Sequence, residues 1–169
     1  DIQVAQKALM EGKCAAEAKP ELKPVIEMIK KSYPDVNHSN IGYGSTIFAV
    51  KPGDGSAREQ AASCQKVLGG FANICYEFAT KRYRSNCINW GMLPFTLDAD
   101  TPFDHQPGDC VFVPDVRKLV GQGSEDFPAM VLRADGSKTP LVLHVRGLTD
   151  DEREILLDGC LMNYYAKRG

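Results

Sequence analysis

The chain has 169 residues, and its 20 Lys and Arg against 22 Asp and Glu give a formal net charge of -2 at pH 7. This length can bury most of the apolar surface of the unfolded chain, and the near-neutral balance gives no reason to expect nucleic acid or an anionic membrane as a partner. No apolar run reaches the length of a bilayer span, and residues 1–20 lack the apolar core of a signal peptide.

The first part of the chain is predicted to be helical. Residues 2–18 are rich in Ala, Lys, Glu and Gln and favour a helix in which Gly12 is a weak point. A second helix is expected between Pro20 and Pro34, because the apolar residues there recur at helical spacing. The stretch 34–44 is dense in Asn, Gly, Ser and Asp, which is typical of a loop.

The next residues predict a strand-helix-strand unit. Residues 45–50 form a strand-like run, residues 57–68 favour a helix that ends at Gly69-Gly70, and residues 72–78 are apolar enough for a buried strand. Because such a connection is right-handed, the helix begins at the carboxyl edge of the sheet. Open α/β sheets usually bind ligands at that edge.

The second half is predicted to be richer in strands. A short helix over residues 81–90 comes first, and residues 110–114 are strand-like. Residues 129–133 and 141–145 predict a hairpin around Asp135-Gly136. The pattern is typical of a mixed α/β domain.

The last predicted helix begins with a capping box of Thr149 and Glu152. Its apolar face is formed by Ile155, Leu156, Cys160, Leu161 and Tyr164. For the whole chain we expect a helical N-terminal segment over residues 1–44 and the main domain over residues 45–169.

The six cysteines are widely spread, and no two of them form a Cys-x-x-Cys pair, so the sequence indicates no metal site. Most have apolar neighbours, where a reduced cysteine behaves as a small core residue. The even number leaves a disulfide framework open, but the length of the chain favours a reducing compartment. We therefore expect a cytoplasmic location. The cysteines are Cys14, Cys64, Cys75, Cys87, Cys110 and Cys160.

Residues 53–60, Gly-Asp-Gly-Ser-Ala-Arg-Glu-Gln, are the part of the chain that most favours chemistry. Glycines permit positive φ, and the start of a helix leaves amide N–H groups unpaired, which favours anions. Arg58 adds a planar fork suited to a carboxylate, and Ser56 a hydroxyl in the same field. The structural alternative is a capping box of Ser56 and Glu59.

Two separated motifs carry a resemblance to a known family. Residues 53–60 are similar to the Gly-x-Gly-Ser-Ser-Arg-Glu-His signature of the aconitase and isopropylmalate isomerase superfamily. Residues 84–95, Arg-Ser-Asn-Cys-Ile-Asn-Trp-Gly-Met-Leu-Pro-Phe, resemble its Asn-x-x-x-x-Gly-Leu-Leu-Pro segment. The resemblance covers roughly residues 45–120 and implies an aconitase-type swivelling β/β/α domain, with a mixed sheet and a C-terminal helix.

The resemblance also implies a function, as the substrate-closing domain of an aconitase-like iron-sulfur hydro-lyase that acts on a di- or tricarboxylic acid. Ser56 matches the general base, and Arg58 matches an arginine that binds a substrate carboxylate. Ala57 replaces the second serine of the signature, so only its backbone, beside that of Gly55, is expected to bind substrate. Gln60 replaces the histidine common in isomerases.

The 4Fe-4S cluster of the family is implied to lie outside this chain, in other domains of the same protein or in a large partner subunit. The Thr-Asp-x-Ile motif and the extra arginine that open such domains also have no counterpart in residues 1–44. We therefore expect the carboxyl-terminal portion of a larger hydratase. The alternatives are the small subunit of a two-subunit isopropylmalate isomerase and a non-catalytic α/β domain that binds an anion.

Other polar residues are expected to be structural. The basic residues 81–84 are interpreted as a solvated helix face rather than an RNA site, because the whole chain is slightly acidic. Whether Arg82 or Arg84 faces the same site as Ser56 is left open. The three histidines are isolated in sequence, and His144 is expected to be a core histidine.

Overall fold

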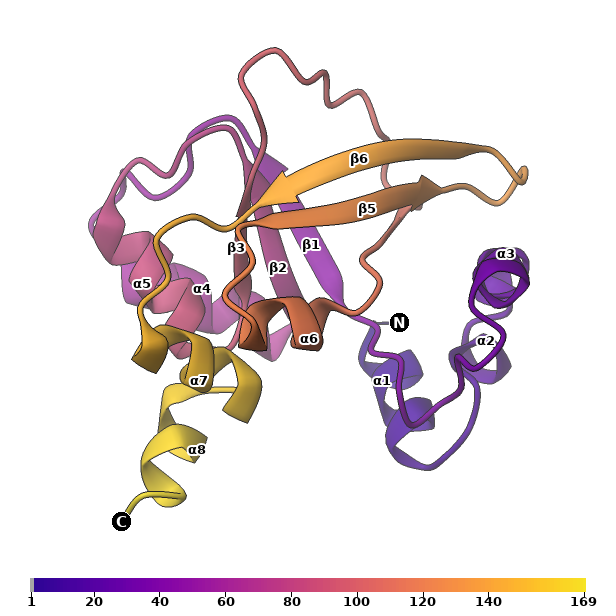
Figure 1. Ribbon diagram of the computed structural model, residues 1–169, viewed down its shortest axis with the longest axis horizontal. Coiled ribbons are helices and arrows are strands. Elements are labelled where there is room, and N and C mark those ends of the chain that lie inside the picture. The colour runs from indigo at the N-terminus through magenta and orange to yellow at the C-terminus, as the bar shows by residue number, and fades with distance from the viewer. Residues whose placement is uncertain (1) are drawn as a thin grey trace. The chain divides into compact units, whose positions relative to one another are not determined.

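The computed structural model describes residues 2–169, which form six strands and eight α-helices (Figure 1). The helices are α1 (Ile2–Met10), α2 (Ala15–Ala18), α3 (Lys23–Ser32), α4 (Arg58–Val67), α5 (Lys81–Asn89), α6 (Val116–Gly121), α7 (Asp150–Asp158) and α8 (Leu161–Ala166), with a 3-10 turn η1 (Pro20–Leu22). The strands are β1 (Ser45–Ala49), β2 (Gly70–Cys75), β3 (Leu93–Thr96), β4 (Cys110–Phe112), β5 (Asp126–Leu132) and β6 (Lys138–His144).

The strands form a mixed sheet in the order β1-β2-β3-β6-β5-β4. β1, β2 and β3 are parallel, with Phe48 opposite Ile74 and Ile74 opposite Phe95. β3 pairs with β6 in the antiparallel sense, and so does β4 with β5. The predicted α/β class with a mixed sheet is confirmed.

Two successive strand-helix-strand units, β1-α4-β2 and β2-α5-β3, place the carboxyl ends of three parallel strands at one edge of the sheet. The turns that follow β1 and β2 lie side by side there (Figure 1), because the amide of Ala79 donates to the carbonyl of Pro52 at 2.8 Å. The glycine-rich motif is part of the first of these turns. The predicted strand-helix-strand unit is therefore present, and a second unit adjoins it.

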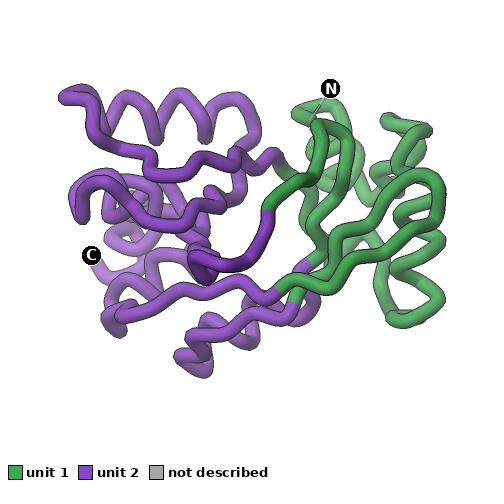
Figure 2. The backbone as a smooth tube through the Cα atoms, turned by 90° about the horizontal axis from the view of Figure 1, so that it is seen from above, with its two compact units in different colours: residues 1–44, 103–112, 129–141 green, residues 45–102, 113–128, 142–169 purple. Residues whose placement is uncertain are grey.

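The chain divides into two compact units, coloured separately in Figure 2. Unit 1 comprises residues 1–44, 103–112 and 129–141, and unit 2 comprises residues 45–102, 113–128 and 142–169. The predicted boundary between a segment 1–44 and a domain 45–169 stays a prediction.

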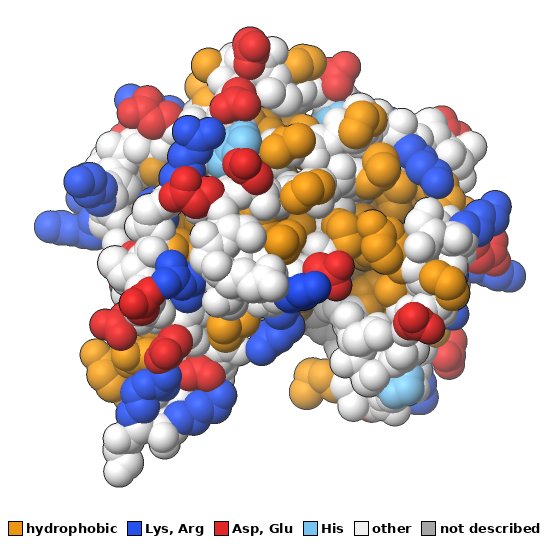
Figure 3. All heavy atoms as spheres, viewed as in Figure 1, with side chains coloured by type: hydrophobic (Ala, Val, Ile, Leu, Met, Phe, Trp, Pro, Cys, Tyr) orange, Lys and Arg blue, Asp and Glu red, His pale blue; other side chains and the backbone are white. Residues whose placement is uncertain are grey.

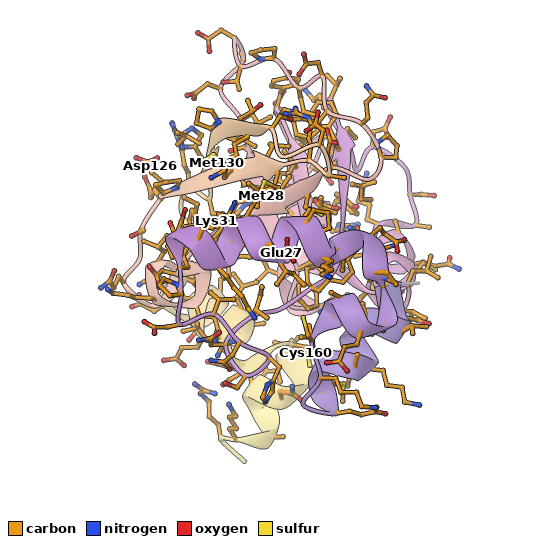
Figure 4. All side chains as sticks on the ribbon, turned by 90° about the vertical axis from the view of Figure 1, so that its right-hand side faces the viewer. Glu27, Met28, Lys31, Asp126, Met130 and Cys160 are labelled. Carbon is orange, nitrogen blue, oxygen red and sulfur yellow. The ribbon has the colours of Figure 1, made fainter. Side chains whose placement is uncertain are left out.

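Each unit has its own buried cluster. In unit 1, Val25, Met28 and Ile29 of α3 pack with Leu132 and Met130 of β5, and Figure 4 shows Met28 and Met130 on these two elements. In unit 2, helices α4 and α5 pack together through four buried side chains. These are Ala62, Tyr83, Cys87 and Met92. The candidate site lies wholly within unit 2.

Three details differ from the sequence-based expectations. The helix predicted over residues 2–18 is interrupted after Met10, where Gly12 has a φ of 78°. The last predicted helix is two helices, because Gly159 takes a left-handed conformation and ends α7. α6 was not predicted. The capping box of Thr149 and Glu152 is confirmed.

Acidic and basic side chains are intermixed on the face shown in Figure 3, notably over the C-terminal helices. There Asp158 pairs with both Lys167 and Arg168, and Arg168 also pairs with Glu154. Among residues 2–169, none of the helices combines the length and the apolar character that crossing a membrane requires. A cytoplasmic location stays a prediction.

Candidate functional site

The turn between β1 and α4 is held at its base by the turn between β2 and α5. The carbonyl of Pro52 accepts the amide of Ala79, and the carbonyl of Gly53 accepts the hydroxyl of Thr80 at 3.0 Å. These bonds fix the chain where it leaves the strand. Residues 55–57, which form the tip of the turn, are exposed.

The two glycines of the motif have different roles. Gly53 has a φ of 96°, and a Cβ built on it would lie 2.5 Å from the Cβ of Tyr83. A side chain is excluded there both by the backbone conformation and by the tyrosine. Gly55 has no positive φ, and a Cβ on it would meet nothing within 4 Å. The expectation of positive φ is confirmed for Gly53 and wrong for Gly55.

Ser56 does not cap the helix. α4 begins at Arg58 rather than at the predicted residue 57, its N-cap is Ala57, and no side chain caps it. Within residues 2–169 the exposed Ser56 hydroxyl has no hydrogen-bond partner. The carboxylate of Glu59, which a capping box would turn back, accepts the indole N–H of Trp90 at 3.0 Å. The structural alternative proposed from the sequence is therefore wrong.

Arg58 folds back over the turn that precedes it. Its Nε donates to the carbonyl of Gly53 at 3.1 Å, and Nη2 donates to the carbonyl of Asp54 at 3.5 Å. A guanidinium has five N–H groups, so three remain for a ligand. Arg58 is half-buried and contributes its positive charge directly beside the serine-bearing turn.

The start of α4 also offers backbone donors. Its first intrahelical bond joins the amide of Ala61 to the carbonyl of Ala57 at 3.0 Å. The amides of Arg58, Glu59 and Gln60 therefore take no partner within the described residues. Unpaired amides at a helix start favour an anion in front of them.

A buried polar cluster lies beneath this turn. The side-chain amide of Asn73 donates to the hydroxyl of Tyr83 at 3.2 Å and to Sγ of Cys87 at 3.1 Å. Burial raises the pKa of Tyr83 to about 12 and that of the Cys87 thiol to about 11. Both groups are therefore neutral near pH 7 and serve to hold α5 against β2.

The cysteines do not fit a 4Fe-4S cluster. All six are free, and no group of three His, Cys, Asp or Glu side chains within residues 2–169 is placed to hold a metal ion. Cluster ligands are thiolates. Burial raises the pKa of Cys75 to about 12, and Cys87 behaves alike, so the two buried cysteines stay protonated.

The other polar residues singled out in the sequence lie elsewhere. Arg84 donates to the carbonyl of Arg146 at 2.8 Å and pairs with Glu152, so it links α5 to the start of α7. Arg82 is exposed. His144 is buried, as expected, and its two ring nitrogens face Asp126 at 2.7 Å and Asp98 at 3.3 Å.

Sequence reasoning did not single out Thr80, although it holds both the turn and the helix behind it. Its side chain caps α5 by accepting the amide of Tyr83. Threonine directly before a helix is a typical cap, and that signal was available in the sequence. The bond to Gly53 was not, because it joins residues 27 positions apart.

Comparisons with known proteins agree with this geometry. Residues 45–100 match the family model of the aconitase C-terminal domain, which spans β1, the Ser56 turn, α4, β2, α5 and β3. The chain is also similar to Aconitate hydratase A of Bradyrhizobium diazoefficiens, with 31% identity over 127 residues, or 72% of this chain. It spans 14% of the length of that relative. The chain therefore carries a domain of the aconitase C-terminal family.

Proposed function

We propose that this chain supplies the general base and a carboxylate-binding arginine to an aconitase-like hydro-lyase. Ser56 is the base, Arg58 binds a carboxylate, and the backbone of Gly55 and Ala57 contacts the substrate. The observation that carries the proposal is the state of Ser56, whose hydroxyl is exposed and free of structural hydrogen bonds. The relative's name supports aconitate, a tricarboxylic acid, as a substrate.

The physical problem in this chemistry is the proton next to a carboxylate, which is very weakly acidic. A serine can remove it only as an alkoxide, so the alkoxide needs preorganised donors and nearby positive charge. The unpaired amides at the start of α4 and the guanidinium of Arg58 supply both. The proton moves from the substrate carbon to Oγ of Ser56, while free N–H groups of Arg58 hold a substrate carboxylate.

The remaining parts of such an enzyme would lie outside this chain. By the family resemblance, a 4Fe-4S cluster would be held by further domains of the same protein or by a large subunit. The small subunit of an isopropylmalate isomerase would use the same residues. The role proposed for Ser56 does not depend on which of these arrangements holds.

The test is the substitution Ser56→Ala in the intact protein, with Ser63→Ala as the control. Ser63 lies on the same helix, where its hydroxyl donates to the carbonyl of Gln60 at 3.1 Å. Loss of a general base should lower kcat for aconitate by roughly 10² to 10⁴ and change KM little. Ser63→Ala should keep kcat.

The opposite result would favour the non-catalytic alternative. If Ser56→Ala turns over aconitate as fast as Ser63→Ala, the serine is not the base. A domain that only binds an anion would show no turnover that depends on this hydroxyl and at most a modest change in anion affinity.

A further inference from the structure

The hydroxyl of Thr80 makes two hydrogen bonds in opposite senses. Oγ1 accepts the amide of Tyr83 at 3.2 Å, which caps α5, and donates to the carbonyl of Gly53 at 3.0 Å, which holds the turn. A hydroxyl can do both at once, because it has one donor and two acceptor positions. Thr80 therefore connects the start of α5 directly to the base of the turn that carries Ser56.

The carbonyl of Gly53 is shared with the arginine of the site. It accepts both the hydroxyl of Thr80 and Nε of Arg58, at 3.0 and 3.1 Å. A shift of this carbonyl would move the guanidinium as well as the backbone that leads to Ser56. The position of Arg58 and the course of the turn are thus set at a single acceptor.

The α5 side of this connection is firmly held. The ring of Tyr83 lies directly against Gly53, and its hydroxyl accepts the amide of Asn73, which is 2% exposed. The tip of the turn, in contrast, has no hydrogen bond of its own at Ser56. The orientation of the serine therefore depends on bonds made at the base.

We propose that Thr80 is a positioning residue for the pair formed by Ser56 and Arg58. Its bond to Gly53 keeps the serine hydroxyl and the guanidinium in the relative placement that proton abstraction needs. This inference rests on the proposed function. Small misplacements of reacting groups cost large factors in rate, so removing the bond should be felt in kcat although Thr80 touches no substrate.

The test compares Thr80→Val, which keeps the shape and loses both bonds, with Thr80→Ser, which keeps the hydroxyl. In the intact protein, Thr80→Val should lower kcat for aconitate by roughly 10-fold to 100-fold. Thr80→Ser should stay within about threefold of the wild type, since serine can make both bonds. An unchanged kcat in Thr80→Val would overturn the inference.

Loss of a helix cap is separated from positioning by a matched control. Thr149 caps α7 by accepting the amide of Glu152 at 3.2 Å, so Thr149→Val removes an equivalent cap away from the turn. It should lose similar stability and keep kcat. An equal fall of kcat in Thr149→Val would overturn the inference. If Thr80→Val does not fold, Thr80→Asp replaces it, because an ionised carboxylate can cap α5 but cannot donate to Gly53.

A double-mutant cycle then shows whether Thr80 acts through the serine. In a Ser56→Ala background, Thr80→Val should have no further effect on kcat, because the group that it positions is gone. The same factor in both backgrounds would contradict a positioning role. A wild-type kcat in Ser56→Ala would refute the proposed function instead, whereas a loss in Ser56→Ala with none in Thr80→Val would refute only this inference.

Discussion

Two neighbouring helix starts, those of α4 and α5, follow parallel strands at the same sheet edge and treat their hydroxyl residues in opposite ways. Before α5, Thr80 caps the helix and its hydroxyl is fully used. Before α4, Ser56 leaves the cap to Ala57, and its hydroxyl has no partner within the described residues. The third example, Thr149 before α7, caps like Thr80.

The difference teaches that the free hydroxyl is not a consequence of poor local structure. The turn before α4 is anchored by Gly53, Thr80 and Arg58, and all of its bonds are made at the base. A serine that served structure would fill the empty cap position, since capping is worth about 1 kcal/mol. The chain forgoes this stabilisation at Ser56, which is the behaviour expected of a reactive group.

The largest expected effect separates the two glycines of the α4 turn. Gly53→Ala should destabilise the protein by about 2 kcal/mol or more, because alanine is strained at positive φ and its Cβ would overlap Tyr83. Gly55→Ala should stay within about 0.5 kcal/mol. Urea unfolding of both variants checks this, and equal losses would contradict the anchored-base account.

A second prediction concerns the buried groups that support α5. The folded-state pKa is raised to about 12 for Tyr83 and Cys75 and to about 11 for Cys87, above the ordinary values of 10.0 and 9.0. The unfolded chain therefore loses these protons first, so stability should be full below about pH 9 and fall as the pH rises toward 11. Urea midpoints between pH 8 and 11 measure this fall. Cys75→Ala should make the slope shallower, and a flat profile in the wild type would show that burial does not hold these groups neutral.

The smallest expected effect is the stability of the serine variant itself. Ser56→Ala should change the free energy of unfolding by less than about 0.5 kcal/mol, because no hydrogen bond is lost. Thr149→Ala should lose about 1 kcal/mol, because it removes a formed cap. Thermal unfolding of the pair tests the comparison, and it fails if the two variants are destabilised equally.

Much of the fold was predictable because its elements are marked locally. The strand before Gly53, the helix that ends near Gly69-Gly70 and the hairpin around Asp135-Gly136 follow from apolar runs and turn residues. β3 was not predicted, since it has four residues and includes Pro94, which argues against a central strand. The break at Gly159 was missed because the apolar face continues past it in sequence.

The candidate site was predictable as a motif but not as a geometry. The types and spacing of Ser56 and Arg58 are visible in the sequence, and so is their resemblance to a family signature. Whether the serine caps the helix is decided by where the first helical bond forms, and the sequence suggested the wrong answer. The carbonyl shared by Thr80 and Arg58 depends on packing between two turns, which no local pattern encodes.

The central claim is that Ser56 removes the proton next to a carboxylate, and isotope exchange tests it most directly. In D₂O the intact protein should exchange this proton of its substrate with solvent, as followed by proton NMR. We expect Ser56→Ala to lose this exchange together with turnover, while Ser63→Ala keeps both. Exchange at the wild-type rate in Ser56→Ala would show that another group is the base and would contradict the account.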